Sequence, residues 1–227
     1  MLLDMEDKFT VSCKEVMKDN TLPYYPYYQG SKSLSGKYEA FKHEKHFVYD
    51  KLLQDTINDA LKIELEKQGI KNKKRIGLGE TVIYDNPKVF IRQSAKELIA
   101  NIDFGVSAAN NSLYVFSLRN NSAHSLFILK FLCAWLNSDF MTFYAQQQNI
   151  IRFAQGKQPQ IKISDLGTIP FPTNFYFQET IVNLAEKVFD KQDSIESHKT
   201  EINNLVYQYY ELSEEQIRHI QKSIKDF

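Results

Sequence analysis

The sequence contains little cysteine. Its two cysteines, Cys13 and Cys133, form no Cys-x-x-Cys pair. His43 and His46 stand close together, but no third histidine or carboxylate triad supports a metal site there. Because zinc sites are usually built from closely spaced Cys and His ligands, we predict no metal in this chain and two reduced thiols.

The chain also lacks an excess of charge of either sign. Lys and Arg together number 28, and Asp and Glu together also number 28. A protein that coats nucleic acid regardless of sequence needs a cationic face, so this balance argues against that class. It leaves sequence-specific DNA binding open, because the distribution of charge matters more than the sum.

Long apolar runs are missing too. The most apolar stretch, residues 126–143, contains Lys130, Asn137 and Asp139. It therefore predicts a buried helix rather than a membrane span. The first residues lack the basic segment and apolar run of a signal peptide. We expect a cytoplasmic protein with no membrane partner.

Catalytic motifs are equally scarce. Adenine-N6 methyltransferases hold the flipped base with Asp/Asn-Pro-Pro-Tyr/Phe, and the closest string, Asp-Asn-Pro-Lys at 85–88, lacks the second proline and the aromatic residue. Gly77 and Gly79 precede an expected strand, so they match a nucleotide-binding loop poorly. A metal nuclease needs its carboxylates and lysine on strands, whereas Asp55 and residues 64–67 lie on one expected helix. We predict no catalytic residue and no cofactor in this chain.

Aromatic residues, in contrast, make up 13% of the chain, which favours a fold with β-sheet. Residues 23–32 contain two prolines and a glycine, which predict irregular, extended backbone, yet their four tyrosines are too many for a solvated loop. Apolar residues at helical spacing predict an amphipathic helix over residues 50–68, closed by Gly69. The basic run at 71–75 is either a solvated loop or a phosphate-contacting loop.

The middle of the chain mixes strand and helix signals. Residues 124–148 predict a helix that breaks near Asn137, where Ser138 caps a second helix. Residues 161–163 alternate between apolar and polar, which predicts a short strand. The strands of an antiparallel meander are predicted over residues 81–84, 89–91, 98–102 and 113–118.

The C-terminal part has a heptad pattern. A seam of residues at alternating gaps of four and three runs from Ile181 to Tyr209, apolar except at Gln192 and Lys199, which predicts a long helix that begins at about Gln178. The seam either packs on its own or a neighbouring domain, or it forms a coiled-coil spacer or dimer arm. Ser213 and Gln216 match a capping box, which predicts a last short helix.

Four segments in order resemble the TaqI-like C-terminal specificity domain, the target-recognition part of type IIG restriction-modification enzymes and related N6-adenine methyltransferases. Each segment is weak alone, but four in order at similar spacing are specific. Tyr-Gln-Gly at 28–30, before them, is similar as well. The four segments are 86–93 (NPKVFIRQ) with 98–103 and 111–115; 132–138 (LCAWLNS) with 143–144; 159–166 (PQIKISDL) with 169–172; and 202–215.

The resemblance implies an α+β target-recognition domain with a mainly antiparallel, curved β-sheet, helices and a long C-terminal helix. We place this domain at residues 1–175, with a helical insertion at about 50–70, and a C-terminal helical segment at 176–227. In such enzymes the methyltransferase, and often the nuclease, lies N-terminal to this domain. S-adenosylmethionine and Mg²⁺ are therefore expected only there, and double-stranded DNA is the expected partner of this chain.

The function implied is sequence-specific DNA recognition for a separate adenine-N6 methyltransferase or endonuclease. Two alternatives remain open. One is a fragment of a type I restriction specificity subunit, which also joins a recognition domain to a helix. The other is a non-catalytic protein-interaction module, which the neutral charge allows.

Candidate DNA contacts are side chains that match the groups DNA offers. Arg and Lys contact phosphates and guanine, and Gln reads adenine. Residues 149–160 are dense in such side chains. Arg92 has the alternative of pairing with a structural carboxylate. The candidates are Lys32, Lys37, Lys73, Lys74, Arg75, Arg92, Gln93, Lys96, Arg152, Gln155, Lys157, Gln158 and Gln160.

Overall fold

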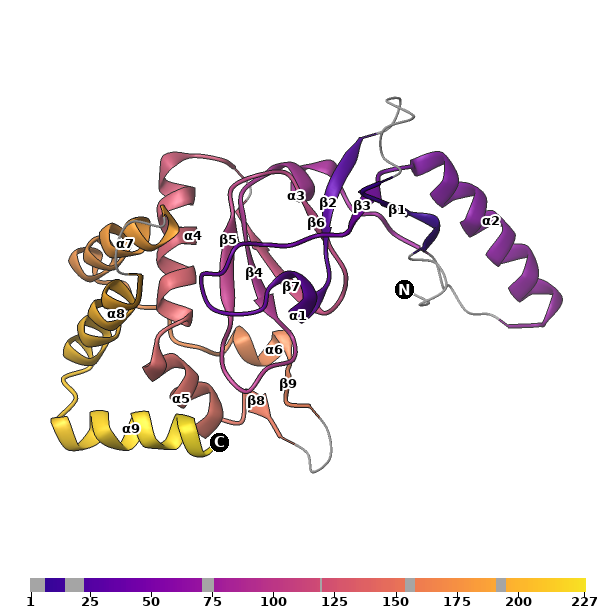
Figure 1. Cartoon of the computed structure of the whole chain (residues 1–227). Helices are drawn as coiled ribbons and strands as arrows, with labels where there is room; N and C mark the ends of the chain where they lie inside the picture. Colours follow the sequence, from indigo (N-terminus) through magenta and orange to yellow (C-terminus); the bar gives the residue numbers. More distant parts are fainter. Residues whose placement is uncertain (1–6, 15–22, 71–75, 119, 154–157, 191–194) are drawn as a thin grey trace.

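The protein has a mixed α+β fold, as predicted (Figure 1). The computed structural model describes residues 7–14, 23–70, 76–118, 120–153, 158–190 and 195–227. Small sheets, mainly antiparallel, occupy the centre. Helices from the C-terminal half lie on one side, and one helix from the N-terminal half projects on the other.

The first sheet joins strands that are far apart in the chain, in the order β1-β3-β2-β6. β3 pairs antiparallel with β1 and with β2, whereas β6 runs parallel to β2. The strands are Thr10–Ser12 (β1), Tyr24–Tyr28 (β2), Lys45–Val48 (β3) and Ala108–Ala109 (β6).

The tyrosine-rich segment is extended, as predicted, but it is regular rather than irregular. Strand β2 and a short helix, α1 (Gly30–Ser33), cover most of it. Tyr25 and Tyr27 are buried, and the ring centroid of each lies 6.3 Å from that of Phe47 on the neighbouring strand. Burying these rings outweighs the ladder hydrogen bond that the proline inside β2 cannot donate.

The predicted helix over residues 50–68 is confirmed as α2 (Lys51–Lys67). Asp50 caps it by accepting a hydrogen bond from the Leu53 amide at 2.8 Å. Gly69 follows the last turn with a φ of +68°, a left-handed conformation that favours glycine. Ile57 is buried, whereas Leu52 is 79% exposed, so α2 projects from the body of the protein (Figure 1).

Residues 81–84 form a short helix, α3 (Thr81–Asp85), so the predicted strand there is wrong. Their β-branched side chains favour a strand only where packing agrees. Here the Tyr84 ring packs with centroids 5.2 Å from Tyr25 and 5.3 Å from Phe47. These tertiary contacts override the local preference.

The second sheet is antiparallel and has the order β5-β4-β7. A meander would follow the chain order, so the predicted meander is wrong although its last three strands are present. After the β4–β5 hairpin, the chain contributes β6 to the first sheet and returns to pair β7 with the free edge of β4. The strands are Lys88–Arg92 (β4), Ala100–Asp103 (β5) and Leu113–Ser117 (β7).

Both faces of β4 are buried. Val89 and Ile91 face the main core, whereas Phe90 faces a smaller cluster with Leu34 and Leu113. Successive residues of a strand point to opposite faces, so a strand covered on both sides reads as a continuous apolar run. The segment that contains α1 and Leu34 therefore lies on the face of the sheet opposite the helices.

Helices α4 (Ala123–Leu136) and α5 (Asp139–Gln147) confirm the predicted break. Ser138 caps α5 by accepting a hydrogen bond from the Met141 amide at 3.3 Å, as predicted. The Asn137 side chain bonds both backbone groups of Ala100 at 2.9 Å, which fixes the break against β5.

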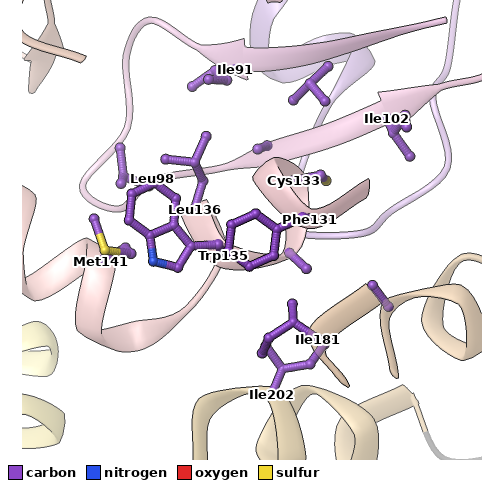
Figure 2. Close-up of a cluster of buried hydrophobic side chains, with 14 of the residues drawn as sticks. Ile91, Leu98, Ile102, Phe131, Cys133, Trp135, Leu136, Met141, Ile181 and Ile202 are labelled. Carbon is purple, nitrogen blue, oxygen red and sulfur yellow. The ribbon is translucent and has the colours of Figure 1, made fainter. Parts of the chain in front are cut away.

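The main core lies between the second sheet and the helices. Figure 2 shows Ile91 and Ile102 of the sheet above Trp135 and Phe131 of α4. Trp135 is 1% exposed. Within the described residues, no single helix is long and apolar enough to cross a membrane. Among the described helices, α4 and α5 together are the one pair that reaches that length and hydropathy, across a bend of 68°.

The C-terminal helical pattern is present, divided between α7 (Phe175–Phe189) and α8 (Ile195–Tyr209). These helices pack on each other and α7 packs on α4. The seam side chains Ile181 and Ile202 are buried in the main core (Figure 2), so this part of the seam packs within the chain. A last helix, α9 (Glu214–Asp226), opens with the predicted capping box.

Candidate nucleic-acid interface

A polar pocket of about 330 Å³ lies where α1 meets the end of β4. The described lining contains two cations and no carboxylate. Such a lining suits an anion or the polar edge of a base. The lining residues are Gln29, Gly30, Ser31, Lys32, Arg92, Ser94, Asn110, Ser112 and Gln158.

Gly30 allows α1 to approach the strand region closely. Its φ is +46°, and a Cβ atom there would lie 2.9 Å from the Ser112 hydroxyl oxygen. Both facts favour glycine, because other residues adopt this conformation at a cost and need room for the side chain. The Ser33 hydroxyl accepts a hydrogen bond from the Gln29 amide at 2.8 Å and holds the turn that presents Lys32.

Arg92 is the last residue of β4, and its guanidinium is held by backbone. Nη2 donates to the Ser94 carbonyl at 2.9 Å and Nη1 donates to the Ser35 carbonyl at 3.4 Å. Burial lowers the pKa of Arg92 while the Glu97 charge opposes the shift, and arginine keeps its proton in either case. In the described part of the chain no carboxylate pairs with it within 4.0 Å. An oriented positive charge therefore borders the pocket.

Ser94 organises two of the candidate glutamines. Its hydroxyl lies 3.2 Å from Gln158 Oε1 and 2.8 Å from the Pro159 carbonyl, and it accepts a hydrogen bond from Gln160 Nε2 at 3.3 Å. A hydroxyl has one hydrogen, so Ser94 donates to one of the two oxygens at a time. The hydrogen bond from Ser94 to Gln158 therefore competes with the shorter one from Ser94 to Pro159.

A short hairpin carries these glutamines. It consists of β8 (Ile151–Arg152) and β9 (Gln160–Ile161), and the helix α6 (Ile163–Leu166) follows it, so only the first part of the predicted strand at 161–163 is a strand. Ile161 donates its amide to the Gln93 carbonyl at 2.8 Å. Its own carbonyl accepts from the Tyr114 hydroxyl at 2.7 Å. The hairpin stem is therefore fixed to the second sheet.

Comparison with known proteins decides the family. A family model described as the TaqI-like C-terminal specificity domain matches residues 14–171 of the 227-residue chain. The chain belongs to the TaqI-like C-terminal specificity domain family. The resemblance stated from the sequence is thereby confirmed. The first two of its four segments, and all of the third except residue 172, fall inside the matched region. No curated protein matches the chain.

The pocket of this specificity domain falls inside the matched region, since its lining runs from Gln29 to Gln158. A specificity domain is a recognition unit, so the family match supports recognition rather than catalysis by this chain. The match ends before α7, and the fourth resembling segment, at 202–215, lies beyond it.

Other candidate cations of the specificity domain are engaged elsewhere. Lys37 lies 2.9 Å from a Glu97 carboxylate oxygen, and its side chain is 14% exposed. Arg152 lies 2.6 Å from Asp165. Lys96 is exposed and donates to the backbone oxygen of Phe227 at 3.4 Å. These contacts balance the charges of Lys37 and Arg152, so neither offers DNA an unopposed cation in this arrangement.

The structure therefore brings part of the predicted site together. Lys32, Arg92 and Gln158 line one pocket, and Gln160 adjoins it through Ser94. Gln93 takes part through its backbone, which accepts the amide of the hairpin. The remaining candidates, Lys73, Lys74, Arg75, Gln155 and Lys157, lie outside the described residues.

Sequence reasoning missed Ser94, Asn110 and Ser112. Asn110 accepts hydrogen bonds from the amide and the hydroxyl of Ser112, and both residues line the pocket with Arg92. Asn110 and Ser112 lie on the turn between β6 and β7, whereas Ser94 follows β4, and no local signal marks them as part of a site. Only the tertiary fold places them beside Lys32.

One group of metal-ligating side chains occurs among the described residues of the specificity domain. It consists of Cys13, His43 and His46, whose ligand atoms all lie within 4.8 Å of one another. None of the three lines the pocket. Cys133, in contrast, is buried in the main core, and this burial raises the pKa of its thiol.

Proposed function

We propose that this specificity domain recognises a DNA sequence for a restriction-modification enzyme and positions a separate adenine-N6 methyltransferase or endonuclease, of the type IIG class, on that sequence. The match to the specificity-domain family carries this proposal. The carboxylate-free pocket with Lys32 and Arg92 supports it, because DNA offers phosphate oxygens and base acceptors to such a surface.

The proposed partners follow from this role. Double-stranded DNA is the ligand, in the cytoplasm, and the methyltransferase and nuclease domains belong to the N-terminal part of the same polypeptide. S-adenosylmethionine and Mg²⁺ serve those catalytic domains. This chain contributes target choice and no bond-breaking group. We keep the division into a recognition domain at 1–175, with its helical insertion, and a helical segment at 176–227 as part of the proposal.

The proposed contacts divide by chemistry. Lys32 is exposed on α1 and supplies a point charge for a phosphate, which positions the protein without reading sequence. Arg92 retains donors beyond its two backbone contacts and can bind the two acceptors of guanine or a phosphate. Gln158 and Gln160 carry the paired donor and acceptor that adenine requires.

A selection experiment tests the proposal. The purified chain is incubated with a duplex pool whose central segment is randomised, and the bound DNA is recovered and sequenced over several rounds. We expect one short sequence to be enriched, and we expect the Arg92→Gln variant to lose or relax one position of it. Binding without any enriched sequence, or no binding at low salt, would overturn the proposal.

The control for this selection is Lys187→Gln. Lys187 is exposed on α7, on the side of the second sheet opposite α1. The Lys187→Gln substitution removes one positive charge, as Arg92→Gln does, but leaves the pocket intact. The control should enrich the same sequence as the unmodified chain.

A further inference from the structure

Cys13 and His46 meet on one face of the first sheet. In the β1–β3 ladder Val11 is opposite His46, and the Cys13 amide extends the ladder by donating to the Glu44 carbonyl at 3.0 Å. Residues two apart on a strand share a face, so Cys13 and His46 are diagonal neighbours on the same face. His43 precedes β3 and brings its ring to the same point.

The spacing of these side chains matches that of metal ligands. Cys13 Sγ lies 3.4 Å from His46 Nδ1. A tetrahedral zinc ion, with bonds of about 2.3 Å to sulfur and about 2.0 Å to nitrogen, separates these two ligand atoms by about 3.5 Å. The pair is therefore already at ligand spacing.

His43 supplies the third ligand. The rings of His43 and His46 have centroids 5.0 Å apart and are nearly perpendicular, at 89°. All three ligand atoms lie within 4.8 Å of one another, and His43 is exposed, so its side chain has room to adjust towards ligand spacing.

We propose that Cys13, His43 and His46 bind a divalent ion of the zinc class, with water in the fourth position. One thiolate and two imidazoles suit Zn²⁺, whereas Mg²⁺ and Ca²⁺ take oxygen ligands. This proposal departs from the sequence-based expectation of no metal, because that expectation considered ligands that are close in the sequence. Cys13 is distant from both histidines along the chain, and only the β1–β3 pairing joins them.

The role of this ion is structural. β1 is a short edge strand, and the described contacts that hold it include its ladder with β3, the buried ring of Phe9, and the ion pair of Lys45 with Asp7 at 2.7 Å. An ion shared by Cys13 and the two histidines fastens β1 to β3. Because the ligands lie outside the pocket, the ion does not touch the proposed DNA contacts.

A cobalt titration tests the site. Co²⁺ is added to the full chain in reduced form, and the absorption spectrum is recorded. We expect the visible bands of tetrahedral Co²⁺ with a thiolate-to-cobalt band in the near ultraviolet, both saturating at one ion per chain and both removed by one equivalent of Zn²⁺. Cys13→Ser should abolish the thiolate band, and His43→Ala and His46→Ala should each weaken Co²⁺ binding at least about tenfold.

The matched control is His124→Ala, which removes an exposed histidine at the start of α4 and should bind Co²⁺ as the unmodified chain does. A spectrum without a thiolate band, or equal affinity in the control and in the three ligand variants, overturns the proposal.

Two measurements on the unmodified chain do not depend on how the variants fold. Zn²⁺ should slow alkylation of Cys13, and it should slow hydrogen exchange of the β1 amides. Unchanged alkylation refutes the site. Slower alkylation with unchanged exchange in β1 refutes the structural role. The DNA selection described above has a separate readout, so failure of the metal site leaves the proposed function standing.

Discussion

Replacing Arg92 with Gln removes the oriented charge of the pocket while keeping the fold. Arg92 contacts two backbone carbonyls, those of Ser94 and Ser35, at the edge of the polar pocket. Water or the glutamine amide can satisfy both carbonyls. We therefore expect the free energy of unfolding to fall by about 1 kcal/mol, the net value of a hydrogen bond or two at a partly exposed site.

The expected effect on DNA binding is larger. If Arg92 contacts a phosphate, its loss should reduce the slope of log affinity against log salt by about 0.9. If it contacts both acceptors of a guanine, its loss should cost about 1–3 kcal/mol, or about 5- to 150-fold in affinity, at one position of the target. Lys32→Gln should reduce the slope by a similar amount for every sequence, because a lysine on an exposed turn contacts phosphate.

The assay is fluorescence anisotropy of a labelled duplex at a series of salt concentrations, first with the randomised pool and then with the selected sequence. Urea unfolding of each variant is measured in parallel. The control, Lys187→Gln, should leave both the affinity and the slope unchanged. If Arg92→Gln remains folded and binds with the same affinity and slope as the unmodified chain, the pocket is not the DNA-contacting site.

Three further predictions concern the fold. Ile181→Ala should lower the free energy of unfolding by about 2–5 kcal/mol in urea, because Ile181 is fully buried in the main core, whereas Ile163→Ala at a side chain 55% exposed should change it by under about 0.5 kcal/mol. Gly30→Ala should destabilise the protein more than Gly69→Ala. Both variants force alanine into a left-handed conformation, at a cost of about 1–2 kcal/mol, but of the two only the alanine at position 30 would also press against Ser112. Equal losses in the free energy of unfolding would contradict this account. Burial raises the pKa of Tyr25 and Tyr84 to about 12. Since the folded state holds these protons more tightly than the unfolded state, their contribution to stability is intact below about pH 10 and is lost as the pH rises towards 12. In urea unfolding across this range, Tyr84→Phe should lose less stability than the unmodified chain.

Features encoded within a few residues could be predicted from the sequence. The break at Asn137 and the start of α5 follow from Ser138, whose cap involves an amide three residues away. The last helix follows from the capping box of Ser213 and Gln216 in the same way. Helix α2 has both a helical apolar pattern and a glycine at its end. In each case the deciding contact is local, so the sequence alone contains it.

Features that depend on distant contacts could not be predicted. Tyr84 turns a strand-like segment into α3 because it packs on aromatic rings of β2 and β3, about 40–60 residues earlier in the chain. The order β5-β4-β7 depends on β6 joining another sheet. Neither arrangement has a signature in the nearby sequence.

In the candidate site, too, some features follow from the local sequence and others depend on distant contacts. Residue type alone selects Lys32, Arg92 and Arg152 equally. The structure separates them, because Asp165 pairs with Arg152, whereas Arg92 is held by carbonyls and Lys32 is exposed beside the same pocket. A carboxylate that approaches through folding cannot be identified from spacing along the chain.

The fixed stem of the β8–β9 hairpin has a consequence for how target choice changes over evolution. The amide and carbonyl of Ile161 are both bonded to the second sheet, and its side chain is buried. Substitutions between Arg152 and Gln160 therefore leave the anchoring bonds in place. New side chains at exposed positions of that interval, such as Gln158, can be tried against DNA while Ile161 stays bonded to the second sheet, so selection can act on recognition and on stability separately.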